Sequence, residues 1–291
     1  MKRPLPSPKK GRIGEGRNER LLMKGVIIYK MSGAGNDFVV LDGRGVDVSE
    51  FRRTERIREV CAEFRTDGLM ILEGSADADF RMEFFNPDGS GGMMCGNGGR
   101  CIVAFADWLG IAPADGRTYH FLAPDGPHTA EILSKTEKGW TVKLKMIDVE
   151  GVSEVLDGYF LNTGTRHFVK FVEDVDAIDV STEGKKLRWN EAFAPEGANI
   201  NFVQRMPDGT LKIRTFEKGV EGETLACGTG ITASAIAAGF LGSVQNGSDG
   251  ESGRISIRLQ ARRGDILTVD FIPDGPAYFS SIHLTGPAEL L

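Results

Sequence analysis

The strongest constraint on the fold of this chain is an internal repeat that covers most of its length. The segment CGNGGRCIVAFADWLG at residues 95–110 aligns without gaps with CGTGITASAIAAGFLG at residues 227–242, and six of the sixteen positions are identical. The two segments lie 132 residues apart. A repeat of this length decides the architecture first, because each copy is expected to fold into the same unit.

An offset shorter by one residue recurs in three other pairs of segments. The pairs are Gly33-Ala-Gly-Asn36 with Gly164-Thr-Arg-His167, Gly68-Leu-Met-Ile with Asn199-Ile-Asn-Phe, and Phe85-Asn86 with Phe216-Glu217. A nearly constant shift across four segments predicts two homologous halves of about 130 residues. Each half then carries its own Gly-rich turn, strand, cysteine loop and helix.

Short strand-like segments outnumber helical segments in both halves. Helices are predicted at residues 49–65, 98–109 and 230–241, and most of the remaining apolar segments are typical of short strands. Strands and helices do not alternate regularly, so the pattern favours the α+β class over a doubly wound sheet. We expect the domains to divide near residues 123–129, where Pro and Gly cluster. The expected parts are an N-terminal domain at 23–127, to which a strand at 280–291 returns, and a C-terminal domain at 128–279.

The charge distribution sets the first 22 residues apart from the rest of the chain. They carry seven Lys or Arg against two Asp or Glu, whereas the whole chain has a net charge of −6. This balance argues against a nucleic-acid-binding protein. The segment lacks the apolar core of a signal peptide, and no apolar run approaches the length of a membrane span, so we expect a cytoplasmic protein. We expect residues 1–22 to be a disordered basic extension, with an arm that contacts nucleic acid or membrane as the alternative.

Four cysteines in a chain without a signal-peptide core fit a reducing compartment better than a disulfide framework. Cys61 lies on the apolar stripe of the first predicted helix and Cys101 lies inside the second, so both are expected to be structural. Cys95 and Cys227 each precede Gly-x-Gly and an apolar helical segment. A thiol at a helix N-terminus lies near the positive end of the helix dipole, which lowers its pKa.

The two cysteine motifs together predict a site for proton exchange beside a carboxylate. The Gly-x-Gly segments leave helix N–H groups open to a small anion, and a pseudo-two-fold arrangement places one thiol on each side of it. One thiolate can remove an α-proton while the other thiol protonates the opposite face, and the amides stabilise the enediolate. This chemistry requires neither a metal nor a cofactor.

Three other uses of the cysteines remain open at this point. A redox dithiol usually has the spacing C-x-x-C, which is absent. A structural zinc site usually has closely spaced Cys and His pairs, whereas the histidines here are scattered at His120, His128, His167 and His283. Both cysteines could also lie buried in Gly-rich packing turns, which the duplication disfavours.

Three motifs are distinctive in combination: KMSGAGNDFVVLDGR at 30–44, FRMEFFNPDGSGGMMCGNGGRC at 80–101 and FEKGVEGETLACGTG at 216–230. Together they resemble the diaminopimelate epimerase family. The resemblance runs from about residue 26 to the C-terminus. It implies two pseudo-two-fold-related α+β domains, each a curved mixed or antiparallel sheet around a central helix, with the active site in the cleft between them. The implied reaction is cofactor-independent conversion of LL-2,6-diaminopimelate into the meso form, for lysine and peptidoglycan precursor synthesis.

The resemblance also assigns roles to the matching residues. It makes Cys95 and Cys227 the acid/base pair, and it makes His167 and Glu217 the residues that modulate their protonation. Differences between repeat-equivalent positions, such as Asn36 against His167, suit a site in which one sulfur is a thiolate and the other a thiol. Substrate binding is implied for Asn36, Asn86, Gly96, Asn97, Thr165, Asn199, Glu217, Lys218, Gly228 and Thr229, with Gly68 and Arg166 as two further candidates.

The chain departs from the family pattern at the far end of the substrate. Lys218 stands where the family usually has an Arg that helps to hold the far carboxylate, and lysine lacks the bidentate fork. Thr165 and Arg166 replace the Asn and Pro of the family's Gly-Asn-Pro-His, and Gly68 stands where some members have Gln. We hypothesise that Arg166 and Lys218 together hold the far carboxylate.

Two alternative functions follow from these departures. One is a racemase or isomerase of the same fold that acts on a different amino acid. The other is a non-catalytic amino-acid-binding protein, which the retention of both cysteines with their glycines disfavours. The sequence does not fix the oligomeric state, and a homodimer is compatible with it.

Overall fold

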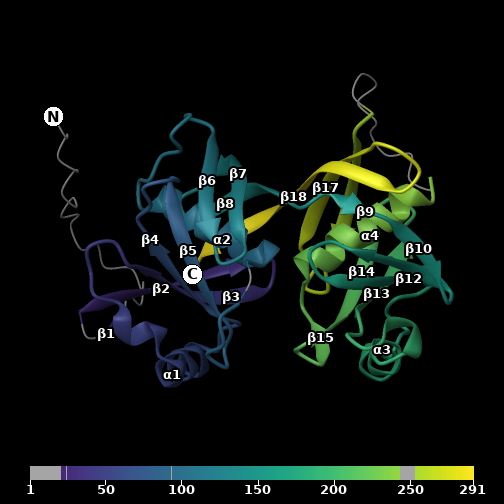
Figure 1. Ribbon diagram of the computed structural model, residues 1–291, viewed down its shortest axis with the longest axis horizontal. Helices are drawn as coiled ribbons and strands as arrows, with labels where there is room; N and C mark the ends of the chain where they lie inside the picture. Colours follow the sequence, from purple (N-terminus) through teal and green to yellow (C-terminus); the bar gives the residue numbers. More distant parts are fainter. Residues whose placement is uncertain (1–20, 24, 93, 243–252) are drawn as a thin grey trace.

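The computed structural model describes residues 21–23, 25–92, 94–242 and 253–291, and these residues form two lobes (Figure 1). Each lobe is a curved sheet around one buried helix, α2 (Gly96–Trp108) in the first lobe and α4 (Gly228–Phe240) in the second. All of residues 96–106 in α2 are buried, and so are residues 228–238 in α4 apart from Thr229. A helix that is buried on every side needs cover on every side, and a curved sheet supplies it.

The sheet of the first lobe closes on itself through the C-terminal strand. Strands β2 to β8 pair in chain order, and β18 pairs with both β8 and β2. The pairs β3·β4 and β5·β6 are parallel, so the sheet is mixed. The strands are β2 (Val26–Gly33), β3 (Asn36–Asp42), β4 (Leu69–Glu73), β5 (Phe80–Phe85), β6 (Thr118–Ala123), β7 (Gly126–Lys135), β8 (Gly139–Lys145) and β18 (Tyr278–Leu290).

The sheet of the second lobe follows the same plan. It runs from β10 through β14 and then β16 to β18, and β18 pairs with β9, which precedes β10 across Gly151. The short strand β15 (Gly222–Thr224) pairs with the end of β14. The other strands are β9 (Val149–Glu150), β10 (Val152–Val155), β11 (Gly158–Asn162), β12 (Arg166–Phe171), β13 (Asn199–Arg205), β14 (Leu211–Glu217), β16 (Ile255–Gln260) and β17 (Ile266–Pro273).

The two lobes therefore repeat one topology. Helix α1 (Thr54–Phe64) joins the parallel strands β3 and β4, and α3 (Val180–Arg188) joins the parallel strands β12 and β13. The paired residues Leu69 and Phe85 have their counterparts 131 positions later in the pair Ile200 and Phe216. The prediction of an α+β chain with two homologous halves, each a curved sheet around a central helix, is confirmed.

Strand β18 ties the two lobes together. Between Phe279 and Thr285 it pairs with β17 of the second lobe, and from Gly286 to Glu289 it pairs with β8 of the first. In Figure 1 it is the yellow strand that passes from one lobe into the other. The end of the second half thus completes the sheet that surrounds the helix of the first half.

The predicted domain boundary does not fit the strand pairing. A divide between residues 127 and 128 would cut β7, which forms a hairpin with β6. Pro and Gly cluster there because a tight turn joins two strands of one sheet, and not because a linker joins two domains. We propose a boundary at residues 146–148, where the chain leaves β8 and enters β9.

Two further predictions need correction, and one helix was missed. Leu21–Met23 forms strand β1, paired with β2, so the prediction of disorder is wrong for residues 21–22, while residues 1–20 lie outside the described part. The helix predicted at 49–65 is a 3-10 turn (Ser49–Arg52) and α1, separated by the extended residue Arg53. Helix α3 was not predicted because Gly184 lies at its centre. There it packs against Phe216, where a Cβ would lie only 2.4 Å from the Phe216 Cβ.

Candidate active site

The N-termini of α2 and α4 meet at the boundary between the lobes. A Cβ added to Gly96 would lie 3.5 Å from Gly228 Cα, and one added to Gly228 would lie 3.3 Å from Gly96 Cα. Leu284 of β18 packs against both glycines. A Cβ at either position would already touch the opposite glycine, so the two glycines allow two positive helix ends to lie side by side.

Cys95 and Cys227 are the N-cap residues of these two helices. Cys95 is half-buried, and its Sγ accepts a hydrogen bond from the Gly98 amide at 3.3 Å. Cys227 is only 7% exposed, and its Sγ lies 3.4 Å from Thr229 Oγ1. Each thiol therefore adjoins the glycine junction from its own lobe.

The pKa values of the two thiols differ from what the sequence predicts. Burial raises the pKa of Cys95 to about 11 and raises that of Cys227 further. The amide of Gly98 opposes the increase at Cys95, as the helix terminus was expected to do, but desolvation outweighs it. The charge of Glu217 raises the pKa of both thiols. Both cysteines are therefore neutral at pH 7 when no ligand is bound.

A buried arginine that the sequence analysis did not select lies under the first turn of α2. Arg100 is fully buried and donates to Gly96 O at 3.1 Å, to Asn97 Oδ1 at 2.9 Å and to Pro287 O at 3.3 Å. Its charge lowers the pKa of Cys95, against the effect of burial. The repeat-equivalent residue in α4 is Thr232, which has no charge. A single charged residue within the otherwise uncharged stretch 96–106 was the signal that could have identified it.

Asn36 and Asn97 link the two Gly-rich segments of the first half. Asn97 Nδ2 donates to Asn36 Oδ1 at 2.5 Å and to the carbonyl of Ala226, at 3.4 Å, in the second half. Asn97 Oδ1 accepts from Arg100. These side-chain contacts fix the first turn of α2 against Ala226, the residue that precedes Cys227. The first N–H groups of α2 have no partner within the helix and point out of its N-terminus.

His167 lies in the corresponding position of the second half, behind Cys227. Its Nε2 lies 2.9 Å from Thr165 Oγ1, and Thr165 Oγ1 lies 3.4 Å from Thr229 Oγ1. Its Nδ1 lies 3.1 Å from Asn201 Nδ2. Burial lowers the pKa of His167 to about 3, so the imidazole is neutral at physiological pH.

Glu217, Lys218 and Asn199 line the end of β14 next to these residues. The amide of Lys218 donates to Asn199 Oδ1 at 2.8 Å, and Asn199 Nδ2 donates to Thr165 Oγ1 at 3.3 Å. Burial raises the pKa of the Glu217 carboxyl, and the nearby Thr224 hydroxyl opposes this. The Lys218 side chain is exposed, and no ion pair of its Nζ with another described residue is present.

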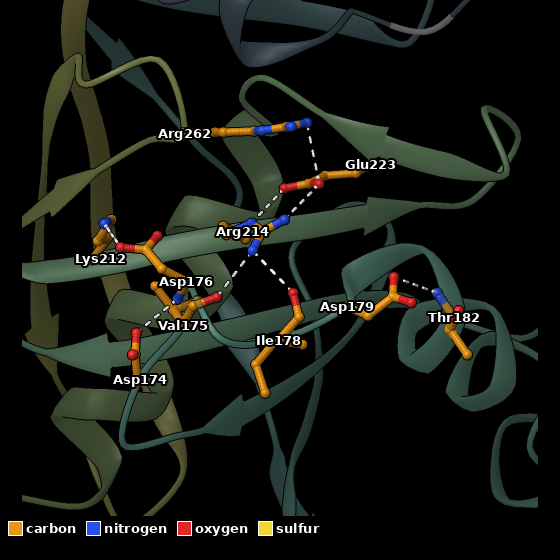
Figure 2. A network of polar contacts seen from close by, with 10 residues as sticks. All are labelled: Asp174, Val175, Asp176, Ile178, Asp179, Thr182, Lys212, Arg214, Glu223 and Arg262. Atoms are coloured by element: carbon orange, nitrogen blue, oxygen red, sulfur yellow. Dashed lines mark hydrogen bonds and ion pairs between the residues drawn. The ribbon is translucent and has the colours of Figure 1, made fainter.

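An ion-pair network holds the strand that leads from Glu217 to Cys227 (Figure 2). Arg214 of β14 binds both carboxylate oxygens of Glu223 in β15, at 2.7 and 2.8 Å, and Arg262 adds a contact at 3.1 Å. Arg214 also donates to the carbonyls of Val175 and Ile178, which precede α3. A bidentate arginine at this point fixes β15 to β14, and with it the approach of the chain to Cys227.

Three predicted binding residues have other contacts in the structure. Arg166 lies over the Phe160 ring at 5.0 Å and 3.4 Å from Glu196, and as a strand neighbour of His167 it points to the opposite face of the sheet. Asn86 Nδ2 donates to Ser90 Oγ within its own turn. Gly68 packs against Phe84 and Phe85, leaving no room for a side chain. None of these contacts is with Cys95 or Cys227.

The described residues contain no group of three or more His, Cys, Asp or Glu side chains that could hold a metal ion. Within the same part of the chain, none of the helices has the length and apolar character needed to cross a bilayer. All four cysteines are free thiols.

Comparison with known sequences gives matches over both lobes. A family model described as "Diaminopimelate epimerase" matches residues 28–150 and 159–270, one range for each repeat. A diaminopimelate epimerase of Flavobacterium psychrophilum is 40% identical over 268 residues, covering 91% of this chain and 97% of its own. One from Chlorobaculum tepidum is 39% identical, with coverage of 89% and 96%.

Solved structures at lower identity share the fold. A PhzF-family phenazine biosynthesis protein of Bacillus anthracis has a TM-score of 0.67 at 16% identity, covering 91% of this chain and 96% of its own. A hydroxyproline epimerase of Agrobacterium vitis has a TM-score of 0.65 at 16% identity, with coverage of 91% and 89%. The matches over both repeats and the identity to the curated relatives show that this chain belongs to the diaminopimelate epimerase family.

Proposed function

We propose that this isomerase converts LL-2,6-diaminopimelate into the meso form by proton transfer through Cys95 and Cys227. The observation that carries the proposal is the junction of Gly96 and Gly228, where two helix N-termini meet with a cysteine before each. Facing N–H groups favour a carboxylate at this point, and the flanking thiols are then placed to reach the two faces of its α-carbon.

The reaction follows from the chemistry of the two sulfurs. One thiolate takes the α-proton, and the electron pair of the C–H bond passes into the carboxylate to form an enediolate. The other thiol then gives its proton to the opposite face of the α-carbon and becomes the thiolate. The amides of residues 96–97 and 228–229 stabilise the negative charge as it develops, which lowers the barrier without a cofactor.

We propose that the second lobe binds the far end of the substrate. Lys218 follows Glu217 directly, and its backbone amide is held by Asn199 Oδ1. Among the described residues, its Nζ forms no ion pair. We assign the far carboxylate to Lys218. Arg166 remains a candidate only if its side chain leaves Glu196 and Phe160, which is why it takes second place.

The cellular setting of the proposal is the cytoplasm. Both cysteines have to be free thiols for the reaction, and a reducing compartment maintains them in that state. The reaction would then serve lysine and peptidoglycan precursor synthesis, with the protein acting alone on its substrate or as a homodimer.

Chiral analysis of the product tests the proposal. Purified protein is incubated separately with LL-diaminopimelate and with L-lysine, which has the same chain but lacks the far carboxylate. We expect formation of the meso isomer and no measurable racemisation of L-lysine. Preference for a monocarboxylic amino acid would replace the proposed substrate by that of another racemase of this fold, and binding without turnover of either compound would indicate a non-catalytic protein.

A further inference from the structure

A row of hydrogen bonds leads from Cys227 into the interior of the second lobe. Cys227 Sγ lies 3.4 Å from Thr229 Oγ1, Thr229 Oγ1 lies 3.4 Å from Thr165 Oγ1, and Thr165 Oγ1 lies 2.9 Å from His167 Nε2. Asn201 continues the row at His167 Nδ1, 3.1 Å away. The direction in which the protons point along this row can be derived from its inner end.

Asn201 determines which nitrogen of His167 carries the proton. The carbonyl of Phe168 can only accept, so the Asn201 atom 3.0 Å from it is the amide nitrogen. Asn201 Oδ1 in turn accepts from the Thr215 hydroxyl at 3.0 Å. The second amide proton of Asn201 then points to His167 Nδ1, which must accept. Because the imidazole is neutral, its one proton lies on Nε2 and points to Thr165.

Thr165 passes this direction on toward the sulfur. Its hydroxyl oxygen accepts from His167 Nε2 and also from Asn199 Nδ2 at 3.3 Å, which uses both lone pairs. The single hydroxyl proton of Thr165 is left for Thr229 Oγ1. The proton of Thr229 is then directed to Cys227 Sγ. Every donor in the row therefore points toward Cys227.

The first lobe has no equivalent of this row. In the repeat alignment, Ala34 and Asn36 correspond to Thr165 and His167, and Asn97 corresponds to Thr229. The Asn36 side chain accepts from Asn97, and neither it nor Ala34 offers a hydroxyl to Cys95. The side chains around the two sulfurs are thus different although their backbones repeat.

We propose that Thr165 is a positioning residue that transmits the fixed orientation of His167 through Thr229 and holds the Cys227 sulfur as a hydrogen-bond acceptor. This inference rests on the proposed two-thiol reaction, in which Cys227 acts as the base in one direction. It also gives Thr165 a role other than binding the far carboxylate, because both its lone pairs and its proton are already in use. Of the other groups that face Cys227, Glu217 and Cys95 are repulsive when charged, so the hydroxyl row opposes them.

The test is the rate of thiol alkylation at pH 8 in Thr165→Val, with Thr165→Ser as the matched control. Iodoacetamide labels the full-length protein without substrate, and peptide mass spectrometry measures Cys227 and Cys95 separately. Thr165 is exposed, so valine fills its space without entering the core. In Thr165→Val we expect the labelling rate of Cys227 at pH 8 to fall about 3- to 10-fold, while the rate at Cys95 stays within twofold.

The serine variant should restore the wild-type labelling rate at Cys227, because it keeps the hydroxyl. An unchanged Cys227 labelling rate in Thr165→Val, an equal change at Cys95, or a serine variant that behaves like valine would each overturn the proposal. A melting curve confirms that the variants remain folded. Since labelling requires no substrate, failure of the protein to act on diaminopimelate would refute the proposed function and leave this readout intact.

Discussion

The surroundings of Cys95 and Cys227 differ more than the backbones that carry them. Both cysteines cap a buried helix and adjoin the same glycine junction. Cys95 has the buried charge of Arg100 beneath it, whereas Cys227 has a row of hydroxyls that ends at the neutral His167. Two equal sulfurs would compete for the same protonation state, so a duplicated site needs such differences to hold one thiolate and one thiol at a time.

The largest effects are expected from removing either sulfur. Cys95→Ala or Cys227→Ala should lower kcat for epimerisation by at least about 10³-fold, because each thiol performs a separate proton transfer in the proposed reaction. Cys61→Ala, in the buried face of α1, should retain wild-type turnover. Product formation followed by chiral chromatography measures all three. Wild-type turnover by either of the first two variants would mean that the lobes do not act as a pair.

The next comparison concerns Arg100, whose repeat-equivalent residue in α4 is the uncharged Thr232. Arg100→Met should raise the pKa of Cys95, because it removes the buried charge that opposes desolvation, and kcat/KM should fall about 10- to 100-fold. It also leaves the acceptors on Gly96, Asn97 and Pro287 without their donor, so the melting temperature should fall. Thr232→Val, at the equivalent position of α4, serves as the control.

Cys95 and Cys227 labelling profiles separate the two effects of Arg100→Met. A shift at Cys95 alone is the expected electrostatic result. Equal shifts at both sulfurs would indicate a general disturbance of the helix junction, and the assignment of Arg100 to the first lobe's sulfur would be wrong.

A third comparison sets Lys218 against Arg166. Lys218→Ala should weaken kcat/KM for diaminopimelate about 10- to 150-fold, because a charge-assisted hydrogen bond to the far carboxylate is lost. Arg166→Ala should change it less than threefold, since Arg166 contacts Glu196 and Phe160 on the other face of the sheet. A larger loss of kcat/KM in Arg166→Ala than in Lys218→Ala would support the sequence-based hypothesis that Arg166 supplies the guanidinium fork.

The pH profile of wild type gives a smaller but direct comparison. Because burial raises the pKa of Cys95 to about 11 and that of Cys227 further, the form with one thiolate is scarce at pH 7. One of the two thiols has to lose its proton before it can act as the base, so kcat/KM should rise about tenfold per pH unit between pH 7 and 9. A plateau from pH 7 would show that one thiol is already ionised in the free enzyme.

The smallest effect is expected at the N-terminus. A chain that begins at Met23 loses Leu21 and Leu22 of strand β1, which pairs with the start of β2. Turnover should stay within a few-fold of wild type, and the melting temperature should drop slightly. A loss of more than tenfold in turnover would assign the segment a role in the reaction.

Much of this molecule could be predicted from its sequence because a duplication repeats its signals. The cysteine loops and their helices were located to within two residues, since the glycines and apolar residues recur in both halves. Closure of the first sheet by β18 brings together strands more than 130 residues apart in the chain, and no local pattern indicates the domain boundary that results.

The electrostatics of the site were the least predictable part. A cysteine before a helix indicates a lowered pKa, but whether desolvation outweighs the dipole depends on what packs around the sulfur. Arg100 resembles a solvated charge until the helix around it is known to be buried on all sides. Thr165 resembles a substituted substrate contact until its three hydrogen bonds are counted.

Deuterium incorporation tests most directly the central claim that one sulfur from each lobe acts on opposite faces of the same carbon. Wild-type protein is mixed with LL-diaminopimelate in deuterium oxide, and both isomers are recovered at low conversion for mass measurement. The two-thiol reaction should give one deuterium in the meso product and none in the remaining LL substrate, because the proton removed by one sulfur is replaced from the other. Deuterium entering recovered substrate as fast as product, or product without deuterium, would show that a single base serves both faces.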